Sequence, residues 1–127
     1  MCTVTYVPLE NGALICSNRD EKMGRPRALP PRWQEVNGAR LLFPKDTLAN
    51  GTWIAMKPNG NMAVLLNGGW VKHIPAHPYH KSRGLVFLDI ASSDDMISGF
   101  ENVSLEGIEP FTVILLQEGY LQENRWD

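Results

Sequence analysis

Strand-forming segments that come in pairs, each pair joined by a short turn, most limit how this chain can fold. β-branched and aromatic residues fill the segments, and glycine, proline and asparagine separate them. Short connections make paired strands antiparallel. Three hairpins are predicted, from residues 3–7 with 13–18, residues 52–57 with 62–66, and residues 111–116 with a strand that begins at 120–122.

Two helices are expected between the second and third hairpins. Leu85, Leu88 and Ile90 indicate a short helix, and the serine and aspartate residues before residue 96 supply an N-cap for a second helix over residues 95–102. Residues 23–50, in contrast, contain four prolines and keep no period of 2 or 3.6, so a long surface loop with short extended pieces is expected there. The predicted class is α+β.

Length and charge limit the functions that this chain can have. A single domain over residues 1–127 is expected, because 43% apolar residues suffice for one modest core. The net charge of −2, with both signs interspersed, gives no basic stripe for a nucleic acid. No apolar run approaches the ~20 residues of a membrane helix, and no signal peptide begins the chain, so a cytoplasmic location is expected. Cys2 and Cys16 would then both be reduced, with Cys16 in the core.

Cys2 directly follows the initiator Met1. Removal of Met1 would leave a cysteine that carries both a thiol and a free α-amine. An α-amine titrates near about 7.7 to 8.0, so it can accept the thiol proton at neutral pH and activate the sulphur as a nucleophile. The alternative is that Cys2 is a small apolar residue at the start of a strand.

The chain resembles the NRDE family, which is named for its Asn-Arg-Asp-Glu motif, here Asn18 to Glu21 at the end of the second strand. That family includes the proteins called transport and Golgi organisation protein 2, and it looks like a distant branch of the N-terminal-nucleophile hydrolases, whose cysteine members include bile-salt and penicillin V acylases. The resemblance implies an αββα sandwich of antiparallel sheets, of which this chain would be the N-terminal half. Further matches are Arg25-Pro26, Gly51-Thr52-Trp53, residues 63–67 and Ser82-Arg83-Gly84.

The resemblance assigns catalytic roles to Arg19, beside the Cys2 thiol, and to Asp20, near the amino terminus. Arg19 would favour the thiolate and Asp20 would orient the amine. Strand alternation puts Arg19 on the face of Ser17 and Asp20 on the opposite face, so both reach one site only where the strand ends or bends. The alternative is a solvated ion-pair cluster at a strand end.

Asn67 is the fourth candidate catalytic residue. A side-chain amide followed by Gly68 and Gly69 suits an oxyanion hole, and its position resembles that of the oxyanion asparagine of bile-salt hydrolases. Asn-Gly is equally the commonest tight-turn pair. Glu21 either orients Arg19 or Lys22 or is a solvated charge at the strand end. The candidate substrate-binding residues are Asn18, Trp53, Gly68 and Arg83, and Arg83 would face the site or cap the next helix.

The remaining histidines and tryptophans give weaker signals. Spacing would place three histidines on one face of a helix, but Pro75 and Pro78 break such a helix, so no metal site is expected. The tryptophans would wall a pocket or pack in the core. These residues are His73, His77 and His80, and Trp33, Trp53 and Trp70.

Three functions remain open from the sequence. The first is an N-terminal cysteine amidohydrolase or acyl-transfer enzyme without a cofactor, acting on a small acyl-amide or thioester substrate. The second, implied by the resemblance, is a non-enzymatic carrier of haem or lipid, with Cys2 or a loop histidine as an axial ligand to haem. The third is a structural fragment that self-associates through an unpaired sheet edge beside residues 111–116.

Overall fold

The computed structural model describes residues 2–127; Met1, on whose removal the proposed nucleophile depends, lies outside them. Strands and helices follow in the order expected, with one additional hairpin. The elements are β1 (Thr3–Leu9), β2 (Gly12–Asn18), β3 (Leu29–Val36), β4 (Ala39–Lys45), β5 (Ile54–Met56), β6 (Met62–Asn67), α1 (Arg83–Ser92), α2 (Met96–Asn102), β7 (Phe111–Gln117) and β8 (Tyr120–Trp126).

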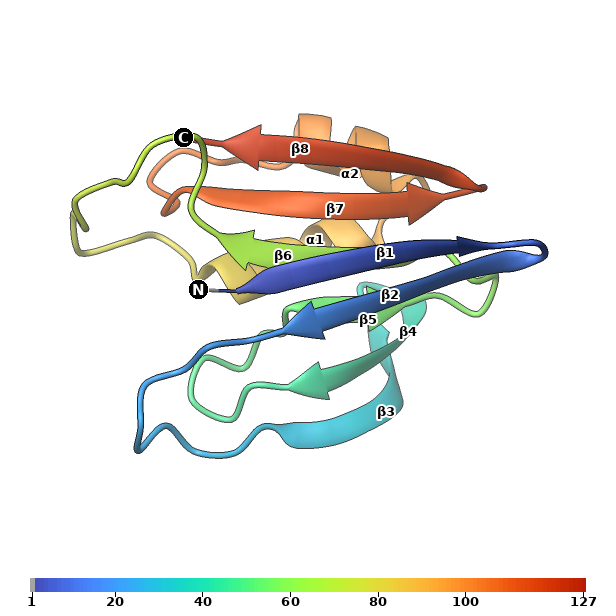
Figure 1. The fold of residues 1–127 in the computed structure, drawn as a ribbon. Helices are drawn as coiled ribbons and strands as arrows, with labels where there is room; N and C mark the ends of the chain where they lie inside the picture. The colour runs from blue at the N-terminus through green and yellow to red at the C-terminus, as the bar shows by residue number, and fades with distance from the viewer. Residues whose placement is uncertain (1) are drawn as a thin grey trace.

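The strands form two antiparallel sheets. β1 and β2 make a hairpin of their own, and the other strands make a larger sheet in the order β3-β4-β5-β6-β7-β8. Figure 1 shows the β1–β2 hairpin lying in front of this sheet and both helices behind it. The α+β class and the stacked antiparallel sheets are therefore confirmed, with layers of hairpin, sheet and helices.

The core lies between the larger sheet and the helices. Alternate residues of the central strands face α1 and α2, because side chains of a strand point to opposite faces in turn. Val64 of β6 stands between two of these core-facing residues in the sequence. It is fully buried on the other face of the sheet. The residues of the core between sheet and helices include Leu41, Phe43, Leu65, Phe111, Val113 and Leu115 from the sheet, and Val86, Phe87, Ile90 and Met96 from the helices.

The helix and turn predictions agree with the structure. Ser82 caps α1 by accepting a hydrogen bond from the N–H of Leu85 at 3.3 Å, and Asp95 caps α2 through the N–H groups of Ile97 and Ser98. The predicted first helical residue, Asp95, is thus the cap of a helix that begins one residue later. Capping chemistry predicted the start of α2, whereas the Ser82 cap of α1 is seen only in the structure.

The expectation of a surface loop over residues 23–50 is wrong. Residues 29–45 form the β3–β4 hairpin, and Leu41 and Phe43 of β4 are buried in the core. Pro30 and Pro31 are tolerated because β3 is an edge strand whose register is irregular beside them.

The turn of this hairpin explains why the strands form despite the prolines. Asn37 and Gly38 connect β3 to β4 with φ angles of +50° and +80°. Positive φ at both central residues is the conformation that matches the twist of paired strands, and Asn-Gly is the dipeptide that adopts it most readily. This local signal outweighs the prolines.

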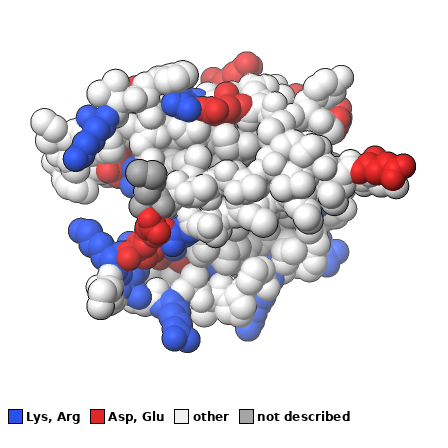
Figure 2. Space-filling model, in the orientation of Figure 1, with Lys and Arg blue, Asp and Glu red and all other residues white. Residues whose placement is uncertain are grey.

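The assignment of Cys16 to the core is also wrong, because Cys16 is exposed. In the β1–β2 hairpin, Ile15 and Ser17 are half-buried and therefore face the larger sheet. Cys16 alternates with them and points to the outer face. Figure 2 shows that the outer surface of this hairpin carries almost no charge between its ends.

Both edges of the larger sheet are open strands. β3 and β8 each have one neighbouring strand in the sheet. β8 follows β7 and is the edge strand on the side where an open edge was predicted. Self-association through that edge stays a prediction. No helix within residues 2–127 is long and apolar enough to cross a membrane.

Lys57 joins the β5–β6 turn to the end of α1. Its ammonium donates to the carbonyl oxygens of Ser93 and Asp94, and burial lowers the pKa of Lys57 against the opposing effect of Asp94 and Asp95. A cation at a helix C-terminus satisfies carbonyls that have no partner within the helix.

Replacement of Lys57 by methionine is therefore expected to lower the free energy of unfolding by about 1 to 2 kcal/mol. Methionine keeps the apolar stem and removes only the donors. Urea denaturation followed by tryptophan fluorescence measures the change. Lys22→Met, in an exposed loop, is the control and should change stability by less than about 0.5 kcal/mol. An equal loss in both variants would contradict the capping role.

Candidate functional site

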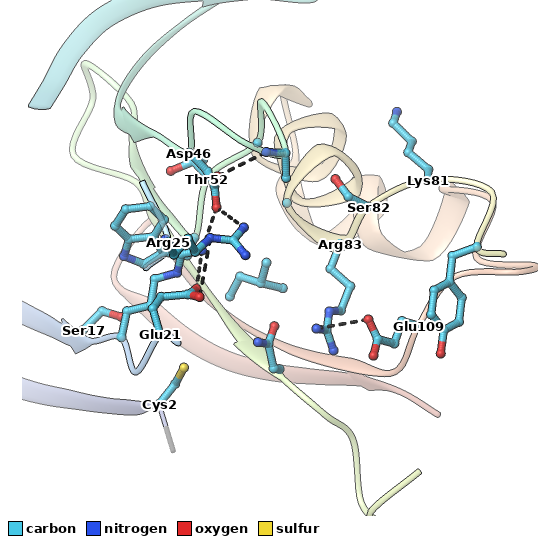
Figure 3. A pocket seen from close by; sticks show the side chains of 18 of the residues that line it. Cys2, Ser17, Glu21, Arg25, Asp46, Thr52, Lys81, Ser82, Arg83 and Glu109 are labelled. Carbon is cyan, nitrogen blue, oxygen red and sulfur yellow. Dashed lines mark hydrogen bonds and ion pairs between the residues drawn. The ribbon is translucent and has the colours of Figure 1, made fainter. Parts of the chain in front are cut away.

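A cavity of about 560 Å³ opens at the end of the molecule where β2 and β6 end and α1 begins. Figure 2 shows basic and acidic side chains gathered around a hollow at the left end, and Figure 3 shows the lining side chains. The lining residues used below are Cys2, Ser17, Arg19, Glu21, Arg25, Asp46, Trp53, Asn67, Arg83 and Glu109.

Cys2 lies at the wall of this cavity, directly before β1. β1 and β2 pair Thr3 with Asn18, so continuing the register by one residue places Cys2 opposite Arg19. Cys2 is half-buried, and its thiol points into the cavity in Figure 3. Ser17 and Arg19 line the same cavity, as strand alternation predicted for that face.

Arg19 belongs to a cluster of alternating charges. Nη2 of Arg19 lies 2.7 Å from Oδ2 of Asp46 and 2.5 Å from Oε1 of Glu21. Nη2 of Arg25 lies 2.6 Å from the same oxygen of Asp46, and its Nε lies 3.5 Å from Oε2 of Glu21. Each arginine thus contacts both carboxylates. Of the two roles open to Glu21, the structure shows the one that orients Arg19.

Asp46 anchors this cluster, although it belongs to none of the motifs recognised in the sequence. Its Oδ1 accepts hydrogen bonds from the N–H groups of Leu48 and Ala49 at 2.9 and 3.1 Å, which fixes the carboxylate in its own turn. Burial acts to raise the pKa of Asp46, but hydrogen bonds from Arg25, Arg19 and these two N–H groups together hold it well below its usual range. Asp46 is therefore a fixed anion.

Trp53 is the apolar wall against which Arg19 is held. The guanidinium carbon of Arg19 lies 4.2 Å from the centre of the Trp53 ring, which is a cation–π contact. Of the two alternatives for Trp53, pocket wall or core packing, the structure shows the pocket wall. A contact between Trp53 and a substrate stays a prediction. Trp33 lines neither this cavity nor the smaller one beside it. The guanidinium carbon of Arg40 lies 5.0 Å from the centre of the Trp33 ring.

Arg83 stands on the opposite wall, at the first position of α1. Its Nη2 lies 3.1 Å from Oε2 of Glu109, and its Nη1 donates to the carbonyl oxygen of Pro110 at 3.2 Å. Burial lowers the pKa of Arg83, and Glu109, Tyr79, Cys2 and Glu21 oppose that effect in decreasing order. Cys2 and Arg83 line the same cavity. Arg83 faces the site and leaves the capping of α1 to Ser82.

Gly51 and Gly84 bring the start of α1 against the loop after β4. A Cβ atom on Gly51 would lie 2.5 Å from the backbone carbon of Gly84, a distance that no side chain can occupy. The N–H of Thr52 donates to the carbonyl oxygen of Gly84 at 3.5 Å. This backbone contact sets Arg83 at the cavity wall, which gives a physical reason for the glycine in each of the two sequence motifs.

Asn67 is the last residue of β6 and lines the cavity with its exposed side chain. Among residues 2–127 its amide has no hydrogen-bond partner, so it can donate to a bound group. The N–H of Gly68 donates to the carbonyl oxygen of Pro110 at 3.0 Å and is not available for an oxyanion. A long segment rather than a tight hairpin turn follows Asn67 and Gly68, so the turn interpretation is wrong.

Three predicted site residues do not line the main cavity. Gly68 lines an adjoining cavity of about 430 Å³, which shares Asn67, Arg83 and Glu109 with the first. Asn18, the last residue of β2, is exposed on the outer side of the hairpin. Asp20 is exposed, and it is not among the described residues around either cavity. The roles expected of Asn18 and Asp20 stay predictions.

The histidines of residues 68–82 are dispersed. Nε2 of His73 lies 2.9 Å from Oε1 of Glu109, His77 lines the main cavity, and the ring of His80 contacts the carbonyl oxygen of Glu106. Within residues 2–127, no group of three or more histidine, cysteine or acidic side chains is arranged to hold a metal ion. Trp70 lines the adjoining cavity.

These features define an α+β protein of stacked antiparallel sheets whose first strand presents a cysteine to a cavity lined by paired arginines and carboxylates. The model of the family described as Transport and Golgi organisation 2 matches residues 1–123, so the chain belongs to that family. The family predicted from the Asn18 to Glu21 motif is thereby confirmed. Comparison with the curated proteins and with the solved structures found no match.

Proposed function

We propose that this chain is an N-terminal cysteine hydrolase or acyl-transfer enzyme that acts on an amide or thioester bond, with a fold related to the N-terminal-nucleophile hydrolases. The observation that carries the proposal is the Cys2 thiol pointing into a cavity that Arg19, Arg83 and Asn67 also line. Removal of Met1 would give this thiol a neighbouring α-amine that accepts its proton, and the thiolate is the reactive form of cysteine.

In the proposed reaction, the α-amine of Cys2 takes the thiol proton once Met1 has been removed. The sulphur attacks the carbonyl carbon, and the carbonyl π electrons move to oxygen. The side-chain amide of Asn67 donates a hydrogen bond to that oxyanion. Collapse of the intermediate expels the amine or thiol, which takes the proton from the α-ammonium. Attack by water, or by a second nucleophile, on the acyl thioester then frees Cys2.

The charge balance of the cavity supports a substrate whose reacting group is neutral. Arg19 and Arg25 face Asp46 and Glu21, and Arg83 faces Glu109, so each cation is matched by an anion. A free carboxylate would compete with partners that are already fixed, whereas a carbonyl needs only the hydrogen-bond donor on Asn67. Amide and thioester carbonyls meet that condition.

The proposal is tested by the relative reactivity of the two cysteines. Intact and peptide mass spectra of the full chain show whether Met1 has been removed, and a time course with iodoacetamide at about pH 6.5 gives the alkylation rate of each thiol. We expect Cys2 to react at least tenfold faster than Cys16, because in the proposed enzyme its thiol proton is taken up by the α-amine of the same residue. Cys16 is the internal control because it is the more exposed of the two.

Exposure alone would give the opposite order, since iodoacetamide reaches Cys16 more easily. A retained Met1 together with an unreactive Cys2 would contradict the enzyme proposal. A Cys2→Ser variant should lose the fast phase, and a Cys16→Ser variant should keep it.

A non-enzymatic lipid carrier is the second candidate, supported by the family's description as Transport and Golgi organisation 2. It differs from the enzyme in tolerating Met1 and a Cys2→Ser change. The cavity is lined both by the ion pairs of Arg19, Arg25 and Arg83 and by apolar side chains such as Trp53 and Leu65. Haem and lipid therefore both stay candidate ligands in this alternative.

A further inference from the structure

Large apolar side chains are concentrated on the loops that border the main cavity. Of the six most exposed large hydrophobic residues in the described chain, five lie in residues 19–28, 46–51 and 68–82, and the sixth is Tyr120. Met23 is fully exposed, Ile74 is 89% exposed and Trp70 is 74% exposed. We call these five residues the apolar rim: Met23, Leu48, Trp70, Val71 and Ile74.

The three loops that carry the apolar rim lie at one end of the molecule, the left end in Figure 1. The same loops supply Arg25, Asp46 and Tyr79 to the cavity lining. The apolar rim thus surrounds the entrance to the cavity, whereas the β7–β8 turn that carries Tyr120 lies at the opposite end. Monomeric proteins rarely gather exposed apolar side chains in one region unless that region binds something.

Basic residues accompany the apolar rim. Residues 68–82 contain Lys72, Lys81 and three histidines but no acidic residue. Within residues 2–127, the side chains of Lys22, Arg27 and Lys72 have no ion-pair partner, whereas Lys81 pairs with Asp89. Of the acidic residues in the same loops, Glu21 and Asp46 pair with Arg19 and Arg25, and Asp20 is exposed, so the basic residues are in excess. The surface around the entrance therefore combines apolar tips with uncompensated positive charge.

We propose that the apolar rim is a docking surface for an anionic lipid bilayer. Tryptophan, isoleucine and methionine on loop tips can enter the interfacial region, and lysine and arginine beside them attract acidic headgroups. Trp70 suits this role, because Arg125 covers one face of its ring at 4.0 Å while the side chain stays exposed. The apolar side chains stand on three separate loops and do not form one continuous face. A deformable lipid surface can accommodate such side chains, whereas a protein partner needs a continuous complementary face.

Docking in this orientation would turn the cavity entrance toward the membrane. An amphiphilic substrate or ligand could then enter from the bilayer without crossing water. The docking surface includes neither Cys2 nor Met1. The docking proposal can therefore be tested independently of the proposed enzyme activity.

Co-sedimentation of the full chain with phospholipid vesicles tests the proposal. The two vesicles are phosphatidylcholine alone and phosphatidylcholine with about 30 mol% phosphatidylserine. The triple variant Trp70→Ser, Val71→Ser, Ile74→Ser removes three tips, and the single variant Ile74→Ser serves if the triple variant folds poorly. The matched control is Tyr120→Ser with Leu121→Ser, which removes exposed apolar side chains from the far end.

We expect the wild-type chain to bind the phosphatidylserine vesicles more than the neutral ones, and less as salt increases. The triple variant should bind about tenfold more weakly, Ile74→Ser should show a smaller loss, and the control should bind as wild type. Absence of binding to both vesicles, or equal losses in the triple variant and the control, would overturn the proposal. So would a wild-type dimer, seen by light scattering, that the triple variant abolishes without any vesicle binding.

Discussion

Replacement of Asp46 by asparagine is expected to lower the free energy of unfolding by about 3 kcal/mol. The side chain of Asp46 is only 8% exposed, and its Oδ2 contacts both Arg19 and Arg25. Asparagine has almost the same shape but no charge, so two partly buried guanidinium groups would share Glu21 alone. Urea denaturation followed by tryptophan fluorescence measures the change.

The matched control is Glu123→Gln, which removes the charge from an exposed pair with Arg125. Exposed pairs contribute little, so this variant should stay within about 1 kcal/mol of wild type. Equal destabilisation of the two variants would show that Asp46 acts only through net charge. Asp46→Asn should also slow the alkylation of Cys2, because Arg19 is no longer held in place beside the thiol.

The stabilisation by Asp46 should depend on pH in a definite direction. The pKa of Asp46 in the folded chain is held below its usual range by Arg25, Arg19 and two backbone N–H groups, which together outweigh the opposing effect of burial. An unfolded aspartate titrates near about 3.9, so the contribution is complete above that pH and is lost as the pH falls through the folded pKa. The difference between wild type and Asp46→Asn should therefore shrink from about pH 5 to pH 3. A constant difference would contradict an ionic role for Asp46.

The fold was predictable wherever the signal was local. The three predicted hairpins and both helices follow from strand-forming runs, turn residues, the apolar spacing of residues 85–90 and the Asp95 cap. The β3–β4 hairpin was missed because its prolines were given more weight than the Asn37-Gly38 turn. Proline excludes a central strand but not an edge strand, and only the complete sheet shows that β3 is at the edge.

The site was predictable only for residues within recognisable motifs. Cys2, Arg19, Asn67 and Arg83 stand in such motifs and meet at the cavity. Asp46 and Glu109 stand in no motif, and they reach the site because β4 and β7 place the ends of distant segments beside β2 and α1. An aspartate that caps its own turn is common, so nothing in the sequence distinguished Asp46 from any other turn residue.

Asn67→Ala is expected to slow acyl transfer to Cys2 by about 10² to 10³-fold while leaving its alkylation unchanged. The two reactions differ in the charge that develops. Attack on a carbonyl places a negative charge on oxygen, which the Asn67 amide would stabilise, whereas displacement of iodide from iodoacetamide forms no oxyanion. Acetylation by p-nitrophenyl acetate, followed through the release of p-nitrophenolate, gives the first rate, and the mass-spectrometric time course gives the second.

Two further variants make the comparison decisive. Cys2→Ser should lose both reactions at this residue, since both need the thiolate. Asn102→Ala, at the end of α2 where the amide bonds to the carbonyl oxygen of Ser98, should change neither. If Asn67→Ala slowed both reactions equally, Asn67 would only shape the cavity around Cys2. If it slowed neither, another donor would hold the oxyanion. Selective loss of acylation would assign the oxyanion to the Asn67 amide, a side-chain donor at the cavity that has no hydrogen-bond partner within residues 2–127.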